Sequence, residues 1–220
     1  MHKYVTEPQA IPFVTVVGDD VAGDAVELEI STEAMEMLDG MQHRKVAVLA
    51  ICGSTNVGKS FLANRYLGRM KGFKTRGLLG QGTRGIYMWN QTVPLGNDVD
   101  GIILDCQGLT LDGNGTGVNG EQNQSSSDIE EKLFTLTILL ASQLVFNTKG
   151  HITDQTMDEL AILPLLASKI KLRGEDAASK ASADAEEDDD LSSDEEGDSC
   201  EFYKFFPQFN WVVRDLSMDF

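Results

Sequence analysis

At residues 53–60 the chain reads Gly53-Ser54-Thr55-Asn56-Val57-Gly58-Lys59-Ser60, a complete G-x-x-x-x-G-K-[ST] phosphate loop. The apolar run at 46–51 predicts a buried strand before the loop, and residues 59–67 predict a helix after it. In this setting backbone N–H groups and a helix N-terminus can surround phosphates, so we expect residues 53–60 and Phe61 to contact a nucleoside triphosphate. The alternative is a chance match in a glycine-bearing loop, which the flanking strand and helix disfavour.

A second motif, Asp105-Cys106-Gln107-Gly108, ends a short apolar strand predicted at residues 101–105. An aspartate at that strand end can hold Mg²⁺ through water, while Ser60 of the loop binds the ion and Lys59 reaches the β- and γ-phosphates. The lack of a side chain at Gly108 lets a backbone N–H approach the γ-phosphate. A D-x-x-G sequence is common by itself, so a strand-ending turn is the alternative interpretation.

Between these motifs lies Thr83, in the stretch Gln81-Gly82-Thr83-Arg84-Gly85 of a basic, glycine-rich loop. Many NTPases use a threonine in such a loop to close on Mg²⁺ and the γ-phosphate, and they release the loop after hydrolysis. An ordinary surface threonine is an equally good interpretation of the spacing.

Composition excludes several functional classes. The chain has 220 residues, enough for one sizeable core, and no apolar run approaches the length of a membrane span. Its three cysteines, Cys52, Cys106 and Cys200, show no metal-ligand spacing, which favours a reduced, cytoplasmic location. The net charge is −17, but residues 175–201 hold 13 acidic side chains and one lysine, so the remainder carries only −5. The remainder offers no basic surface for nucleic acid.

The periodicity of apolar residues predicts strands that alternate with helices. This alternation predicts an α/β fold: a three-layer P-loop NTPase with a mostly parallel central sheet and helices on both faces. We divide the chain into an N-terminal extension at 1–25 and a nucleotide-binding domain at 26–220 that contains a disordered acidic insert at 174–201. The predicted strands are 26–30, 45–51, 86–92, 101–105, 144–147 and 209–213, and the predicted helices are 32–38, 59–67, 129–142 and 157–170.

Four further stretches share their motifs with a known family. They are K-G-F…G-T-R-G-I-Y-M-W at 71–89, L-D-C-Q-G-L at 104–109, L-V-F-N-T-K-G-H-I at 144–152 with the M-D-E-L that follows, and F-F-P-Q-F-N-W-V-V-R-D-L-S-M-D-F at 205–220. Together they resemble the guanylate-binding protein and atlastin branch of the dynamin-like large GTPases. The resemblance runs from about residue 26 to the end, apart from the acidic insert.

This resemblance implies an α/β GTPase domain that binds GTP or GDP with Mg²⁺ and often dimerises across the nucleotide face. It implies that Thr83 is the closing-loop threonine and that Arg214-Asp215 is the guanine-recognition pair, with the Asp215 carboxylate accepting from guanine N1–H and the 2-amino group. Era-like GTPases of ribosome assembly have a similar phosphate loop but read guanine with N-K-x-D. The sequence Asn147-Thr148-Lys149-Gly150 does not match that motif.

Three residues depart from the family pattern. Asn56 stands where the family usually has an arginine that stabilises charge in the transition state, and loss of such an arginine costs about 10³–10⁵ in rate. Gln81 and Gln107 replace a serine and a glutamate of the family, and a glutamine can orient the attacking water. We therefore expect slow hydrolysis of GTP to GDP and phosphate, aided by Gln81 or Gln107 and by Arg84, Arg76 or a partner's arginine.

The family's domain continues beyond the point where this chain ends, five residues after Asp215. The resemblance therefore predicts a partial domain, truncated at its C-terminal end, with weakened nucleotide affinity and stability. Two alternatives stay open: a non-hydrolysing module in which GTP sets conformation or dimerisation, and an ATPase in which Arg214-Asp215 is incidental.

Overall fold

The computed structural model describes residues 7–18, 27–75, 84–108, 124–154, 156–157, 160–161 and 206–216. The chain forms two units, Met1–Thr153 with Pro207–Phe220, and Asp154–Phe206. In the second unit the structure describes short helical pieces between residues 154 and 161, and residue 206. Most of the helix predicted at 157–170 and all of the acidic insert therefore lie outside the described residues.

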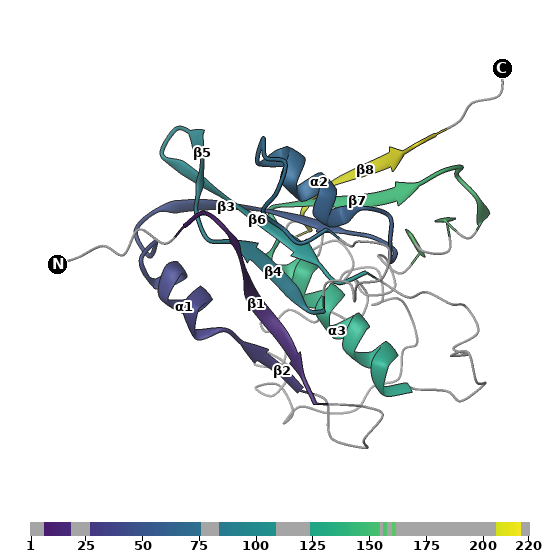
Figure 1. Cartoon of the computed structure of the whole chain (residues 1–220), viewed down its shortest axis with the longest axis horizontal. Helices are drawn as coiled ribbons and strands as arrows, with labels where there is room; N and C mark the ends of the chain where they lie inside the picture. The colour runs from purple at the N-terminus through teal and green to yellow at the C-terminus, as the bar shows by residue number, and fades with distance from the viewer. Residues whose placement is uncertain are drawn as a thin grey trace, which may run out of the picture. The chain divides into compact units, whose positions relative to one another are not determined.

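The first unit contains the sheet and the helices that cover it (Figure 1). Its elements are β1 (Ala10–Val17), β2 (Glu27–Ile30), α1 (Thr32–Asp39), β3 (Lys45–Cys52), α2 (Lys59–Tyr66), β4 (Ile86–Trp89), β5 (Val93–Gly96), β6 (Val99–Cys106), α3 (Gln124–Leu140), β7 (Gln143–Lys149) and β8 (Gln208–Arg214). The boundary proposed at residue 26 stays a prediction, although β1 precedes it and pairs with β2 and β4.

The sheet is mixed, so the prediction of a mostly parallel sheet is wrong. The strand order is β2-β1-β4-β6-β3-β7-β8, and β5 also pairs with β6. Pairs β3–β6, β3–β7 and β7–β8 are parallel, whereas β1–β2, β1–β4, β4–β6 and β5–β6 are antiparallel. The β5–β6 pair is antiparallel because Asn97 and Asp98, with φ of 51° and 60°, make a tight turn that joins consecutive strands directly.

Helices α2 and α3 pack on opposite faces of the sheet. On one face, Ala63 of α2 packs in a buried cluster with Ile51 of β3 and Ile103 of β6. On the other face, the Thr137 hydroxyl of α3 lies 3.4 Å from the Cys106 sulfur of β6. Because successive strand residues point to opposite faces, Asp105 faces α2 and Cys106 faces α3. The structure therefore has the α/β architecture with helices on both faces.

The parallel strands β3, β6, β7 and β8 all end at the same edge of the sheet. The loop after β3, the end of β6 and the ends of β7 and β8 are therefore neighbours. In open α/β sheets, ligands bind outside the carboxyl ends of the strands. This edge gathers most of the residues that the sequence analysis singled out and that the structure describes.

Candidate functional site

The phosphate loop begins where β3 ends and leads directly into α2. Gly53 and Gly58 have φ of 128° and 90°, a region that favours glycine, and Asn56 has φ of 62°. A Cβ at Gly53 would overlap the Asn147 carbonyl oxygen, and one at Gly58 would overlap the Arg214 guanidinium. Conformation therefore favours glycine at both positions, and the Asn147 backbone leaves no space for a side chain at Gly53.

The two motifs that define the loop and the end of β6 meet through side chains. The Ser60 hydroxyl donates a 2.6 Å hydrogen bond to the carboxylate of Asp105, which is only 2% exposed. Lys59 is 7% exposed, and its ammonium donates to the Ser54 carbonyl at 2.7 Å. The loop thus encloses a buried cation beside a buried carboxylate and a hydroxyl.

Ser60 and Asp105 fit the chemistry of a Mg²⁺ site. Mg²⁺ prefers oxygen ligands, and it usually takes only one or two from the protein while water and substrate phosphates supply the rest. A hydroxyl and a buried carboxylate in contact are such a pair. Among the described residues, no three His, Cys, Asp or Glu side chains gather into a self-sufficient metal site.

Gly108 lies against the phosphate loop. A Cβ there would stand 2.6 Å from Thr55 Cα and 2.9 Å from Lys59 Nζ, so only glycine allows this approach. Next to it, Gln107 makes two hydrogen bonds with the backbone of Gly85. Its backbone N–H donates to the Gly85 carbonyl and its side-chain Oε1 accepts from the Gly85 N–H, each at 2.8 Å. The segment after β6 is therefore fixed to the residue before β4.

Two predicted site residues, Gln81 and Thr83, lie outside the described residues, as does Arg76. Arg84 is described, and its guanidinium donates to the Gly18 carbonyl at 3.3 Å. The roles given to these side chains remain predictions.

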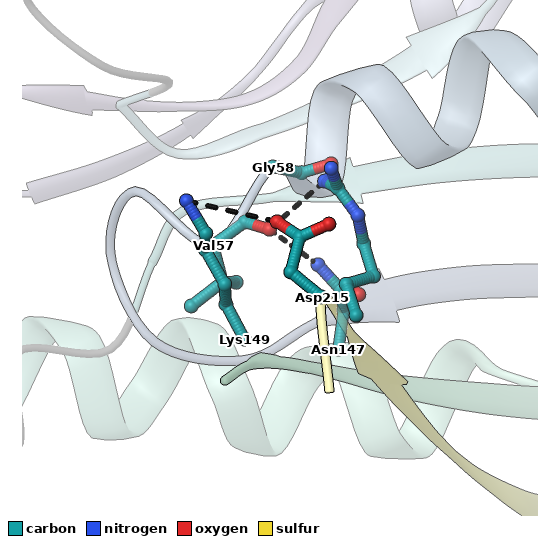
Figure 2. A network of polar contacts seen from close by, with 6 residues as sticks. Val57, Gly58, Asn147, Lys149 and Asp215 are labelled. Carbon is teal, nitrogen blue, oxygen red and sulfur yellow. Dashed lines mark hydrogen bonds and ion pairs between the residues drawn. The ribbon is translucent and has the colours of Figure 1, made fainter. Parts of the chain in front are cut away.

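The side chains of Arg214 and Asp215 point in different directions. Arg214 Nη1 donates to the Val57 carbonyl at 3.1 Å and lies 3.4 Å from the Gly58 carbonyl, and its guanidinium stands 5.0 Å from the centre of the Phe61 ring. Its side chain therefore contacts the phosphate loop. The side chain of Asp215 is 59% exposed at the end of β8, with its carboxylate 3.7 Å from Lys149 Nζ (Figure 2).

Sequence reasoning missed two residues at this edge, Asn147 and Lys149. Asn147 is fully buried, and its amide nitrogen donates to the Val57 carbonyl at 3.0 Å (Figure 2). Lys149 forms the ion pair with Asp215. Their position at the end of a predicted strand, in the stretch 144–152 that carries the family resemblance, was the available signal, but that resemblance assigned no role to either residue.

Cys52 and Cys106 are buried free thiols beneath the site. Burial raises the pKa of Cys106 from 9.0 to about 12, and burial together with the neighbouring Cys106 raises the pKa of Cys52. Both groups are therefore neutral packing residues at neutral pH, and neither is an activated nucleophile.

The free energy of unfolding is expected to fall as the pH rises from about 9 towards 12, because of the ionisation of the Cys106 thiol. The unfolded thiol ionises near 9.0 while the folded thiol keeps its proton to about 12, so this contribution is fully present below pH 9 and is lost above it. Urea unfolding at several pH values, compared between the wild type and Cys106→Ala, isolates the effect from other titrating groups. Identical pH slopes for the two proteins would contradict it.

Comparison with known proteins identifies the family. The family model described as guanylate-binding protein, N-terminal domain, matches residues 25–220. Guanylate-binding protein 3 of Homo sapiens is 33% identical over 193 residues, covering 88% of this chain and 28% of that protein. Guanylate-binding protein 1 of Homo sapiens is 32% identical over 192 residues, and guanylate-binding protein 2 of Rattus norvegicus is 33% identical over 192 residues, each covering 87% of this chain and 28% of that protein.

The chain thus spans a little over a quarter of the length of these relatives. In the part of the chain that the structure describes, no helix is long and apolar enough to cross a membrane. The match extends over the phosphate loop, the end of β6 and the end of β8, which the fold brings to one edge. The chain belongs to the family of guanylate-binding protein N-terminal domains.

Proposed function

We propose that this chain binds GTP and GDP at the carboxyl edge of β3, β6, β7 and β8. The observation that carries the proposal is the hydrogen bond between Ser60 and Asp105 beside the buried ammonium of Lys59. These groups supply a cation for phosphate and an oxygen pair for Mg²⁺ at one edge of the sheet. The name of the matched family supports guanine as the base.

Lys59 is the residue expected to bind the β- and γ-phosphates. Its ammonium donates to the Ser54 carbonyl, a neutral acceptor that a charged phosphate oxygen can replace with a stronger hydrogen bond. The backbone N–H groups of the loop add further donors, and the lack of a side chain at Gly108 lets its backbone lie close to Thr55 and Lys59. Ser60 and Asp105, with Thr83, would hold Mg²⁺, which supplies positive charge to the phosphates.

Asp215 is the proposed reader of the base. Its exposed ion pair with Lys149 contributes little stability, so the N1–H and 2-amino donors of guanine can engage the carboxylate. Adenine presents no such pair of donors, which gives the site its selectivity for GTP and GDP over ATP.

Replacing Asp215 by asparagine is expected to change the base preference. An amide offers one acceptor and one donor, which matches the 2-oxo group of xanthine better than the 2-amino group of guanine. We expect GTP affinity to fall by about 10- to 100-fold and XTP to lose far less or gain. Competition of both nucleotides against a fluorescent guanine nucleotide measures this, and an unchanged GTP-to-XTP ratio would exclude Asp215 as the reader.

We further propose slow Mg²⁺-dependent hydrolysis of GTP to GDP and phosphate. Lys59 and Thr83 would act on the γ-phosphate, and Gln81 or Gln107 would orient the water. The Gln107 Oε1 accepts from the Gly85 N–H, so orienting water through this oxygen would require that hydrogen bond to open or be shared. Phosphate release followed over hours with GTP and Mg²⁺ tests the activity, and release no faster than buffer alone would contradict it.

A non-hydrolysing module is the second candidate, and Asn56 is the observation that favours it. In the loop, Asn56 places a neutral amide at a position of positive φ, where the resemblance implies an arginine. In this alternative, GTP binding would change conformation or drive a homodimer in the cytoplasm without turnover. Nucleotide-dependent dimerisation by light scattering, without phosphate release, would support this alternative.

A further inference from the structure

We infer that Arg214 and Asn147 are positioning residues for phosphate binding and act through the outward carbonyls of the phosphate loop. This inference rests on the proposed nucleotide site and names residues that act on its phosphate half. It also separates Arg214 from Asp215, its neighbour in the chain, which the proposed function assigns to the base.

Both side chains converge on one carbonyl oxygen. Val57 O accepts from Asn147 Nδ2 at 3.0 Å and from Arg214 Nη1 at 3.1 Å, which uses both of its lone pairs. The next carbonyl, Gly58 O, accepts from the Leu62 N–H at 3.0 Å and lies 3.4 Å from the same guanidinium nitrogen. The Val57 carbonyl is therefore held from the side of β7 and β8, and the Gly58 carbonyl is held by α2 and by the longer contact with Arg214.

Because the peptide bond is planar, a contact that holds a carbonyl also orients the N–H group of the same peptide. In a trans peptide the N–H points opposite to the C=O, so the Val57 carbonyl fixes the direction of the Gly58 N–H. In the same way the Gly58 carbonyl fixes the direction of the Lys59 N–H. Arg214 and Asn147 bind the carbonyl side, so the opposed N–H groups point away from β7 and β8, which is the orientation that an anion bound in the loop requires.

Each of the two side chains is itself held in place. The guanidinium of Arg214 lies 5.0 Å from the Phe61 ring centre, and the Arg214 carbonyl accepts from the Gly150 N–H at 2.8 Å. Asn147 is fully buried, and its Oδ1 has no hydrogen-bond partner among the described residues. Burying an amide with an unpaired acceptor is costly, and the hydrogen bond that its nitrogen makes with the loop offsets part of this cost.

The inference predicts that the two consecutive residues affect different properties. Loss of the Arg214 or Asn147 contact frees the loop peptides and weakens every ligand that carries phosphates, whatever its base. Loss of the Asp215 carboxylate alters the choice of base. IDP lacks the 2-amino group of GDP. Substitutions of Asp215 should therefore change the ratio of the affinities for GDP and IDP, whereas substitutions of Arg214 should leave this ratio unchanged.

The test uses the full chain with Mg²⁺ and measures displacement of a fluorescent guanine nucleotide by GDP and by IDP. Arg214→Ala is expected to weaken both nucleotides by the same factor, about 10- to 100-fold, because a charge-assisted hydrogen bond to the loop is lost. Asn147→Ala is expected to act in the same direction, and Arg214→Lys, which keeps the charge without the planar fork, to fall between. Gln208→Ala, an exposed side chain on the same strand, is the control and should change nothing.

The outcomes separate this inference from the proposed function. No displacement by GDP from the wild type would overturn both. If the wild type binds GDP but Arg214→Lys and Asn147→Ala bind it equally well, the positioning role is wrong and the proposed function stands. A changed GDP-to-IDP ratio in an Arg214 variant would make Arg214 a base contact and would also refute the inference. Circular dichroism is used to find a temperature at which all the variants compared are folded. If Arg214→Ala does not fold, Arg214→Lys takes its place in the comparison.

Discussion

Replacement of Lys59 by alanine is expected to lower the affinity for GTP and GDP by at least about 100-fold. The ammonium of Lys59 is buried at the start of α2 and donates to the Ser54 carbonyl of the phosphate loop, so it is the cation placed for the phosphates. Titration of a fluorescent guanine nucleotide with Mg²⁺ measures the loss.

Lys45→Ala is the matched control. Lys45 begins β3 at the opposite end of the strand from the loop and is exposed, so its removal changes the net charge equally without touching the site. Lys59→Met keeps the alkyl chain and tests whether the loss comes from the charge or from packing. Affinity within a few-fold of the wild type in both Lys59 variants would contradict the assignment.

Replacement of Asn56 by arginine is expected to raise the rate of phosphate release from GTP by at least about 100-fold. An arginine that stabilises the charge of the transition state is worth about 10³–10⁵ in phosphoryl transfer, and Asn56 has no charge to offer. The gain should fall short of the full factor because residue 56 has φ of 62°, which arginine adopts less readily than asparagine.

Single-turnover phosphate release measures this gain, with Asn56→Ala as the control that removes the amide without adding charge. Asn56→Ala is expected to leave the rate low. If Asn56→Arg binds GTP normally and releases phosphate no faster than the wild type, then the missing cation does not limit the rate. That result would favour the nucleotide-gated module.

The phosphate loop and its flanking elements were predictable because their signals are local. The run before Gly53 is continuously apolar, as expected for a central strand whose last residues are buried on both faces, and the G-K-S that ends the loop marks the start of a helix. The pairing directions were not predictable, because they depend on connections. The turn at Asn97 and Asp98 makes β5 and β6 a hairpin, and β1, interrupted in its register at Pro12, gave no clear strand pattern.

The sequence singled out residues of the candidate site but not the contacts between them. The sequence placed Ser60 and Asp105 on one site because each motif has a known chemical role. The family resemblance also grouped Arg214 with Asp215 as one recognition pair. The structure places the Arg214 side chain on the phosphate loop, and neither this direction nor the bond from Asn147 to Val57 has a local sequence signal.

The measurement that tests the central claim most directly is binding of a fluorescent guanine nucleotide to this chain with Mg²⁺, followed by competition with unlabelled nucleotides. The account predicts that GTP and GDP displace the label, that ATP does not, and that Lys59→Ala binds the label at least about 100-fold more weakly. Equal displacement by ATP would contradict guanine recognition at Asp215. Absence of binding by the folded wild type, or full binding by Lys59→Ala, would contradict the nucleotide site itself.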